Sequence, residues 1–361
     1  MAQQKQKASA QATRCVSAFA AAAGASMSIA GIAGGLIAAS AYSEARRYVV
    51  QHRNVCLGLA ASEQSGAHSQ PGVYAQLLRI LHLSDFHAMA YNHKLLRFVR
   101  ELRQYEPNLL IFTGDFIAQE QAIEPLLAAL SAFKGTPGVF VYGSNDYYAP
   151  KPKNPFRYLV HNSNEGTQLS EAELAALALP TAALTTGLEE LGFINLNNQR
   201  ATINLGSHIL DFVGVDDPHI DRDSYPGEGS EASRQSLRIG VTHAPYRRIL
   251  NQMCEEGCQL VFAGHTHGGQ VCLPGQRSLV TNCDLPPRLA SGLFEWPTVL
   301  DESIPSQVLK GDGKALLSAS YEGAERTIVQ ISAGLGTTPF VPLRTFCRPE
   351  AIVMDVEFAG N

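Results

Sequence analysis

Three apolar runs near the middle of the chain alternate with two segments of helical periodicity, and this alternation limits the folds that are possible. The runs cover 77–83, 109–112 and 139–142, and the segments 94–105 and 122–133 carry apolar residues at helical spacing. Strand, helix, strand, helix, strand is the pattern of a layered α/β sheet with crossover connections. Ligand sites in such sheets lie outside the carboxyl ends of strands, so we expect the loops after these runs to meet at one edge.

Further elements follow towards the C-terminus. The expected strands cover 209–213, 237–241, 328–332 and 352–356, and the expected helices cover 172–178 and 186–191. Residues 48–59 are either a first strand or a segment that leads into the domain. We expect surface loops at 217–234 and 303–325, where polar, glycine and serine residues are frequent.

The stretch 261–269 (VFAGHTHGG) carries the clearest chemical signal. An apolar run ends, a glycine allows the backbone to turn, and two histidines follow with one residue between them. Neighbouring side chains alternate faces in an extended segment, so His265 and His267 can point the same way. Neutral imidazoles in this arrangement suit divalent Zn, Mn, Fe or Ni.

Loops that follow the apolar runs carry an unusual share of carboxylates, amides and imidazoles. In chain order these residues are Asp85, His87, Asp115, Asn145, Asp146, His243, His265 and His267. Any one of them has an ordinary structural explanation: strand-end Asp residues often cap helices, and His82, inside an expected strand, could be a core histidine. Together they suit two divalent cations, which clamp a phosphoryl group and lower the pKa of a bridging water towards about 7.

The order of these motifs resembles the calcineurin-like metallophosphoesterases. Asp-x-His at 85–87, Gly-Asp at 114–115, a Gly-Asn-His-Asp-like motif at 143–146, a lone His243 and Gly-His-x-His at 264–267 carry the resemblance, which covers 77–356. It implies a four-layer α/β/β/α sandwich of two mixed β-sheets flanked by helices. Pairing such a domain with an apolar N-terminal segment resembles a bacterial membrane-anchored branch that includes enzymes similar to UDP-2,3-diacylglucosamine pyrophosphatases.

The resemblance also implies a role for each position. The first metal would be held by Asp85, His87 and His267, and Asp115 would bridge both metals. The second metal would be held by His243, His265 and an amide oxygen from the 143–146 loop. The implied activity is attack of a metal-bound hydroxide on a phosphomonoester, phosphodiester or pyrophosphate, with two divalent ions (Mn, Fe, Zn or Ni) as cofactors. The catalytic residues would be Asp115, Asn145 and Asp146.

The motif at 143–146 departs from the family pattern, because Ser144 and Asn145 stand where the family has Asn and His. Either the Asn145 amide oxygen reaches the metal, which we favour, or Ser144 or a water takes that place and Asn145 occupies the His position. An amide cannot act as a general acid, which is typically worth 10²–10⁴-fold. We therefore expect substrates whose leaving groups need little protonation, such as aryl esters or phosphoanhydrides, or another donor such as His93 or His219.

The segment after Asp146 is rich in proline and carries two tyrosines and two lysines. We expect a substrate rim of Tyr147, Lys151 and Arg247, with a rigid surface loop as the alternative. The formal net charge of −5 gives no support to a nucleic-acid binder, which needs a basic footprint, so a nuclease is a less attractive alternative. A non-catalytic metal-binding scaffold is the other alternative, and its only support is the change at positions 144 and 145.

Residues 15–43 form an uncharged stretch of 29 residues. As a helix it would be about 43 Å long, enough to cross a hydrocarbon core of ~30 Å. The expected division is a flexible N-terminus at 1–14, a membrane anchor at 15–43, a juxtamembrane linker at 44–76 and the metallophosphoesterase domain at 77–361. A cleaved signal peptide, with a small-residue site at 39–41 and an exported product, is the alternative. Basic residues flank both ends of the stretch, so the membrane side is not decided.

Overall fold

The computed structural model describes residues 34–57, 77–151, 170–206, 208–227, 236–297, 308–310, 313–314 and 326–358. The chain divides into two units, Met1–Ser43 and Glu44–Asn361. In the first unit the described residues, 34–43, are helical, and the side chains of Leu36 and Ile37 are exposed. The rest of the expected anchor, 15–33, lies outside the described residues. Within the part of the chain that the structure describes, no helix has the length and apolar character needed to cross a membrane.

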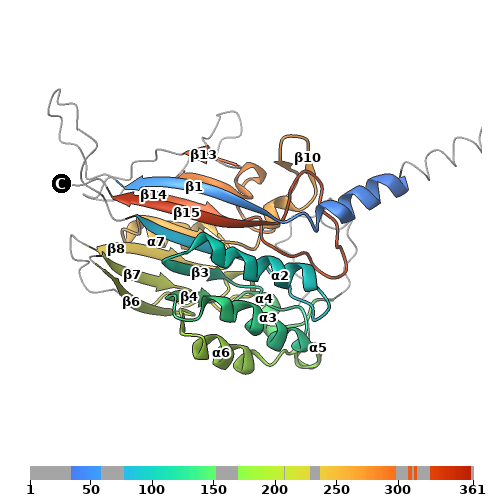
Figure 1. Ribbon diagram of the computed structural model, residues 1–361, viewed down its shortest axis with the longest axis horizontal. Helices are drawn as coiled ribbons and strands as arrows, with labels where there is room; N and C mark the ends of the chain where they lie inside the picture. The colour runs from blue at the N-terminus through green and yellow to red at the C-terminus, as the bar shows by residue number, and fades with distance from the viewer. Residues whose placement is uncertain are drawn as a thin grey trace, which may run out of the picture. The chain divides into compact units, whose positions relative to one another are not determined.

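The second unit contains two mixed β-sheets (Figure 1). The seven-stranded sheet has the order β13-β1-β15-β2-β3-β4-β5. Its strands are β13 Gly313–Lys314, β1 Val49–Leu57, β15 Glu350–Phe358, β2 Leu78–Leu83, β3 Leu109–Thr113, β4 Gly138–Val141 and β5 Phe193–Asn195. Strands β2 to β5 are parallel to one another, and β15 is antiparallel to β2. The three central strands expected from the sequence are thus confirmed.

The six-stranded sheet has the order β12-β14-β9-β8-β7-β6. Its strands are β12 Gly292–Trp296, β14 Thr327–Ile331, β9 Leu260–Ala263, β8 Ser236–Val241, β7 His208–Gly214 and β6 Gln199–Leu205. Strands β14, β9, β8 and β7 are parallel to one another, whereas β12 and β6 are antiparallel edge strands. The sequence predicted the parallel strands and missed both edges. A separate two-stranded sheet pairs β10 Cys272–Leu273 with β11 Arg277–Ser278.

Helices accompany both sheets. The α-helices are α2 His93–Glu101, α3 Ile123–Leu130, α4 Ser144–Tyr147, α5 Glu171–Leu177, α6 Thr181–Glu190 and α7 Arg247–Glu255. The 3₁₀ helices are η1 Leu102–Tyr105, η2 Glu120–Ala122, η3 Ser131–Phe133, η5 Pro218–Ile220, η6 His267–Gly269 and η7 Pro287–Leu289. Figure 1 shows α2, α3 and α6 stacked side by side. In α2 the Asn92 side chain caps the N-terminus by accepting a hydrogen bond from the Leu95 amide.

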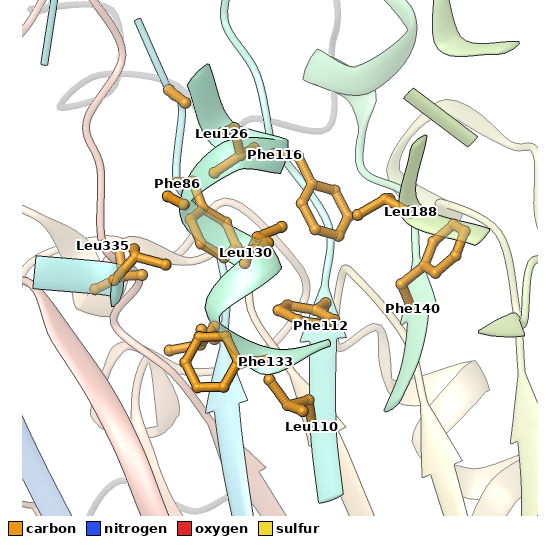
Figure 2. Packing of buried hydrophobic residues seen from close by; sticks show 14 of the residues in the cluster. Phe86, Leu110, Phe112, Phe116, Leu126, Leu130, Phe133, Phe140, Leu188 and Leu335 are labelled. Carbon is orange, nitrogen blue, oxygen red and sulfur yellow. The ribbon is translucent and has the colours of Figure 1, made fainter. Parts of the chain in front are cut away.

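Three large clusters of buried apolar side chains account for most of the packing. One lies between the seven-stranded sheet and the helices α2, α3 and α6, and Figure 2 shows Phe112 of β3 beside Leu130 of α3 and Phe140 of β4 beside Leu188 of α6. A second cluster draws residues from both sheets, and a third joins the six-stranded sheet to α7. Each fully buried side chain of this size contributes roughly 1.5–3 kcal/mol to stability. The sheets are therefore held rigidly, and so are the loops at their strand ends.

Residues 49–57 resolve an alternative that the sequence left open. They form β1, which pairs with β15 along its whole length and also with β13. A strand inside a sheet is part of the folded domain, so the domain begins before the expected boundary at residue 77. The remaining part of the expected linker, 58–76, lies outside the described residues.

Candidate metal centre

The predicted metal ligands gather at the carboxyl ends of strands from both sheets. Asp85 follows β2, Asp115 follows β3, His243 follows β8, and His265 and His267 follow β9. All five are buried or nearly so, with exposed fractions of 0% for Asp85 and His243 and 2% for Asp115. Buried charged and polar groups of this kind need partners, and these residues face one another.

The first ligand group consists of Asp85, His87, Asp115 and His267. One ligand atom from each lies within 4.8 Å of the others. The Nε2 atoms of His87 and His267 are 3.0 Å apart, and His87 Nε2 is 3.3 Å from Oδ2 of Asp115. His267 Nε2 is 3.5 Å from Oδ1 of Asp85. Two imidazoles and two carboxylates converging in this way are a donor set for one divalent cation.

The second ligand group shares Asp115 with the first. Nε2 of His243 lies 3.6 Å from Oδ2 of Asp115, the same oxygen that His87 approaches, and 3.2 Å from Nδ1 of His265. The Asp115 carboxylate therefore stands between the two groups, in the position that the bridging role requires. These distances bring together six of the predicted ligands in two adjoining sets.

Hydrogen bonds fix the orientation of the His243 and His265 rings. The Nδ1 atom of His243 lies 2.6 Å from the carbonyl oxygen of Thr113, which can only accept, so Nδ1 carries the proton. Nε2 of His265 lies 3.0 Å from the carbonyl oxygen of Asn282, so this nitrogen also carries a proton. Nε2 of His243 and Nδ1 of His265 therefore face each other as the nitrogens left to bind a metal, as in metal-ligating histidines whose second nitrogen is hydrogen-bonded to the protein.

The site has an excess of buried negative charge. Burial alone would lower the pKa of His243, but the carboxylates of Asp115, Asp217 and Asp85 outweigh it and raise the pKa to about 9. Burial raises the pKa of Asp115, yet His243, His87 and the hydrogen bonds from Asn145 bring it down to about 2. A proton on His243 is one way to supply the positive charge that these carboxylates require. A divalent cation is the other, so the residues fit a metal centre.

Burial keeps His265 and His267 in the form that binds metals. The pKa values of His265 and His267 are both well below 6.5, because burial and nearby positive charge disfavour the imidazolium. Both rings are therefore neutral at physiological pH, and a neutral imidazole is the ligand form.

The predicted ligand residues adopt backbone conformations that cost energy. Asp85, His87, Asp115, His265 and His267 all have positive φ, between 40° and 68°. Non-glycine residues rarely adopt this region, and such strain tends to cluster at functional sites. Holding five residues in this conformation lowers the stability of these loops, and such a cost is typical of a functional site.

Two glycines permit the close approach of these loops. A Cβ atom on Gly143 would fall 2.3 Å from Oδ1 of Asp115 and 2.6 Å from Nε2 of His243. A Cβ atom on Gly264 would fall 2.5 Å from Oδ2 of Asp85. Only glycine leaves room for these contacts, which explains its place in the Gly-x-x-Asp and Gly-His-x-His motifs.

Asn145 lies against the bridging carboxylate. Its backbone N–H donates to Oδ1 of Asp115 and its side-chain Nδ2 donates to Oδ2, both at 2.8 Å. Ser144 and Asn145 are both half-buried, and Asn145 Nδ2 lies 3.5 Å from Oγ of Ser144. Which of the two contacts the second cation stays a prediction.

Asp146 ties the loop after β4 to the loop after β3. Its carboxylate is fully buried and accepts the backbone N–H of Asp115 at 2.8 Å, of Phe116 at 2.7 Å and of Gly143 at 3.0 Å. These bonds make Asp146 a positioning residue for Asp115. A catalytic role in addition stays a prediction.

The predicted rim residues lie in different settings. The Tyr147 hydroxyl donates to both oxygens of Asp216, at 2.9 and 2.8 Å, and the guanidinium carbon of Arg222 lies 4.0 Å from the Tyr147 ring centroid. Lys151 pairs with Glu173 at 3.4 Å on the surface. Arg247 is exposed at the start of α7.

His219 lies at the centre, against the second ligand group. Its ring centroid is 4.4 Å from that of His265, and its Nδ1 is 3.1 Å from the Tyr246 hydroxyl. The other alternative donor, His93, is exposed at the start of α2. Of the two, His219 is the imidazole that contacts a predicted ligand.

Two further residues at the centre were missed from the sequence. Asp217 is fully buried and its pKa is raised to about 7, mainly by burial. It follows β7, so the same strand-end signal could have found it. Arg344 is fully buried, and its Nη2 donates to the carbonyls of Ala333 and Gly336 at 2.7 Å and lies 3.4 Å from Nδ1 of His267. It sits in an irregular loop that offers no local signal.

Two mixed sheets with carboxylates and imidazoles gathered at their strand ends define a metallophosphoesterase. The chain belongs to the calcineurin-like phosphoesterase family, whose sequence profile matches residues 78–269.

Several curated proteins are similar to the chain. Metallophosphoesterase YkuE of Bacillus subtilis is 25% identical over 333 residues, which cover 90% of this chain and 93% of YkuE. UDP-2,3-diacylglucosamine pyrophosphatase LpxG of Chlamydia trachomatis is 26% identical, with 63% of this chain and 77% of LpxG covered. YpbG of Bacillus subtilis is 28% identical over 54% of this chain, and the match spans 62% of YpbG, less than two thirds of its length.

Among solved structures, the NAD nucleotidase NadN of Haemophilus influenzae matches with a TM-score of 0.37 and 12% identity, covering 73% of this chain and 51% of NadN.

Proposed function

We propose that this chain is a dinuclear metal-dependent phosphoesterase that cleaves phosphoanhydrides or esters with good leaving groups. The single observation that carries the proposal is the placement of Asp115, whose Oδ2 lies 3.3 Å from Nε2 of His87 and 3.6 Å from Nε2 of His243. A carboxylate shared between two imidazole-containing ligand groups suits a pair of cations better than a single one.

Each ligand group would hold one cation. Asp85, His87 and His267 would hold the first, His243 and His265 the second, and Asp115 both. Bound divalent cations would polarise the phosphoryl oxygens and make a water nucleophile available near neutral pH. The chain's own contribution is to orient the rings, to keep those of His265 and His267 neutral, to fix Asp115 through Asp146, and to exclude bulk water by burial.

The substrate class follows from Asn145 and from a relative. Asn145 takes the place of the histidine that the family pattern predicts, and an amide does not donate a proton to a leaving group. The leaving groups of anhydrides and aryl esters depart without being protonated by a general acid. The name of LpxG denotes a pyrophosphatase acting on a lipid-bearing nucleotide sugar, which supports a phosphoanhydride attached to a lipid as the substrate here.

The test is metal analysis combined with an activity screen. We expect the purified chain to bind two equivalents of Mn, Fe, Zn or Ni and to hydrolyse bis-p-nitrophenyl phosphate and nucleotide-sugar pyrophosphates. Asp115→Asn should lose both metal and activity. A chain that binds metal but hydrolyses none of a panel of monoesters, diesters and pyrophosphates would be a scaffold. Preference for DNA or RNA over small substrates would make it a nuclease.

We also propose a four-layer α/β/β/α arrangement and attachment to a membrane by residues 15–43, with 1–14 as a free N-terminus. Three apolar clusters, one between the sheets and one on the outer side of each, support the four layers. The uncharged stretch supports the anchor. Retention in the membrane fraction after carbonate washing, with an intact N-terminus, is the expected result. A mature N-terminus near residue 42 would indicate a cleaved signal and an exported enzyme instead.

A further inference from the structure

A small pocket lies between the start of the second unit and α2. It has a volume of about 150 Å³. Its lining consists of Arg46, Arg47, Tyr48, Lys94, Arg97, Phe98 and Glu101. Four of these side chains are cationic and one is acidic, in a chain whose formal net charge is −5. The pocket is therefore a local concentration of positive charge on a molecule that is acidic as a whole, and it is separate from the predicted ligands.

The pocket has a rigid aromatic wall. Tyr48 and Phe98 stack with ring centroids 5.1 Å apart, and both pack against the apolar cluster beneath α2. Nζ of Lys94 lies 5.9 Å from the Tyr48 ring centroid. The cationic side chains of the pocket lie around this wall. The single acid, Glu101, lies 3.9 Å from Arg97 in an exposed pair, which contributes little.

The charge arrangement works against the stability of α2. The first turn of this helix contains Lys94 and no acidic residue. Backbone N–H groups give a helix N-terminus partial positive charge, so cations there are unfavourable and an anion is favourable. Arg46 and Arg47 add two more cations from a different segment. A bound anion would relieve this repulsion, and local rules are most often broken where a protein functions.

The position in the chain indicates the source of the anion. Arg46 and Arg47 come directly after the uncharged stretch 15–43, which our proposed function places in a membrane, and this inference rests on that attachment. Leu36 and Ile37, nine or ten residues earlier, are exposed by 67% and 66%. Basic residues next to a membrane segment are attracted to anionic lipids, Arg binds phosphate through paired hydrogen bonds, and Tyr suits the headgroup region.

We propose that the pocket formed by Arg46, Arg47, Lys94 and Arg97 binds the phosphate groups of anionic phospholipids. Such binding would hold the catalytic unit against the membrane surface. It would be weaker at high salt, because exposed charges are screened.

Hydrogen exchange of the full-length protein in lipid nanodiscs tests the proposal. With phosphatidylglycerol present, we expect slower exchange at 44–48 and 93–98 than in nanodiscs of phosphatidylcholine alone, and the difference should shrink as salt is added. The quadruple variant Arg46→Gln, Arg47→Gln, Lys94→Gln, Arg97→Gln should lose the difference. The double variant Arg47→Gln, Arg97→Gln, with only exposed positions changed, should lose part of it.

A control variant carries the same change in net charge on exposed residues elsewhere: Arg103→Gln, Lys134→Gln, Arg277→Gln, Arg326→Gln. It should behave as the wild type. Equal protection in both lipids, or protection that survives in the quadruple variant, overturns the proposal. Equal protection by inorganic phosphate in detergent would reassign the pocket to free anions. Hydrolysis of bis-p-nitrophenyl phosphate should be the same in all variants. If the wild type does not hydrolyse this substrate, the proposed function is wrong, whereas the lipid-binding proposal still depends only on the exchange measurements.

Discussion

His243 donates its Nδ1 proton to the carbonyl oxygen of Thr113 across 2.6 Å, and this bond joins the two β-sheets at the metal centre. Thr113 is the last residue of β3 in the seven-stranded sheet, and His243 follows β8 of the six-stranded sheet. Because Nδ1 is committed to the carbonyl, Nε2 is left to face Asp115. This hydrogen bond therefore sets the tautomer of His243, and together with the bonds from the His265 amide to Asp85 it joins the loops of the two sheets.

Replacing His243 should disable the second ligand group while leaving the first in place. We expect His243→Gln to lower the rate with bis-p-nitrophenyl phosphate by more than the roughly 10–100-fold typical of changes around metal ligands. Bound metal should fall from two equivalents towards one, as measured by elemental analysis. His52→Gln, an exposed histidine, is the control. Unchanged metal content in His243→Gln would contradict the assignment of this residue as a ligand.

Arg344 should act on the metal centre through His267. Its guanidinium is held by the carbonyls of Ala333 and Gly336 and contacts His267. We expect Arg344→Lys, which keeps the charge but not the fork of donors, to weaken metal binding roughly 10–100-fold. Arg348→Lys, an exposed neighbour, should change nothing. A metal titration followed together with the melting temperature separates the two possible roles, because a purely structural residue would lower the melting temperature and leave the metal affinity unchanged.

Asn145→His should broaden the range of leaving groups. In the wild type we expect rates with a series of phosphoesters to fall steeply as the pKa of the leaving group rises. An imidazole at position 145 should speed the poorest leaving groups by roughly 10²-fold or more and flatten the slope. Asn145→Gln, which lengthens the amide without adding an acid, is the matched control. A flat dependence in the wild type, with the chemical step limiting, would count against the idea.

The sequence predicted the central strands and singled out the six residues that the structure brings together at their ends, for one physical reason. Both depend on short-range pattern: a buried strand is a run of apolar residues, and its end carries the polar residue that the site needs. Asp85 and Asp115 could be found this way because each follows its strand by no more than two residues. The role of His82 was also foreseen, since it is buried and packs edge-on against Phe262.

What was missed depends on contacts between distant parts of the chain. Arg344 meets His267 across 77 residues, and nothing near it in the sequence marks it as buried. The edge strand β6 was missed because only one of its seven residues, Ile203, is buried, so it contains no apolar run. The edge strand β12 is buried at four of its five positions and was missed because its apolar run is short. The positive φ angles of five predicted ligands could not be predicted either, because no sequence pattern around an Asp or His indicates this backbone conformation.

His82 should make the fold sensitive to acid. Burial lowers its pKa from 6.5 to about 3. Between these two pH values the histidine is protonated in the unfolded chain and neutral in the folded chain. Stability is therefore full above pH 6.5 and is lost as the pH falls towards 3, by about 2 kcal/mol at pH 5. His82→Gln keeps a partner for the Thr113 hydroxyl and removes the titration. Urea unfolding at pH 7 and 5, with chelator present, should show a loss that is smaller in the variant by about this amount. Equal losses in both proteins would mean that His82 does not titrate as described.

Gly143→Ala should separate the geometry of the site from the stability of the fold. Its φ of −110° suits any residue, so the substitution brings no backbone strain, only a methyl group 2.3 Å from Oδ1 of Asp115. To accept the methyl group the loop after β4 must move away from the bridging carboxylate, and the Asn145 and Asp146 bonds move with it. We expect activity to fall by roughly 10²-fold, since a displacement of about 1 Å at a reacting centre costs this much. Gly227→Ala, where no atom lies within 4 Å of the added methyl group, should keep full activity. Equal rates for the two variants would show that the loop has room, and that the close approach of Gly143 to Asp115 is not needed for catalysis.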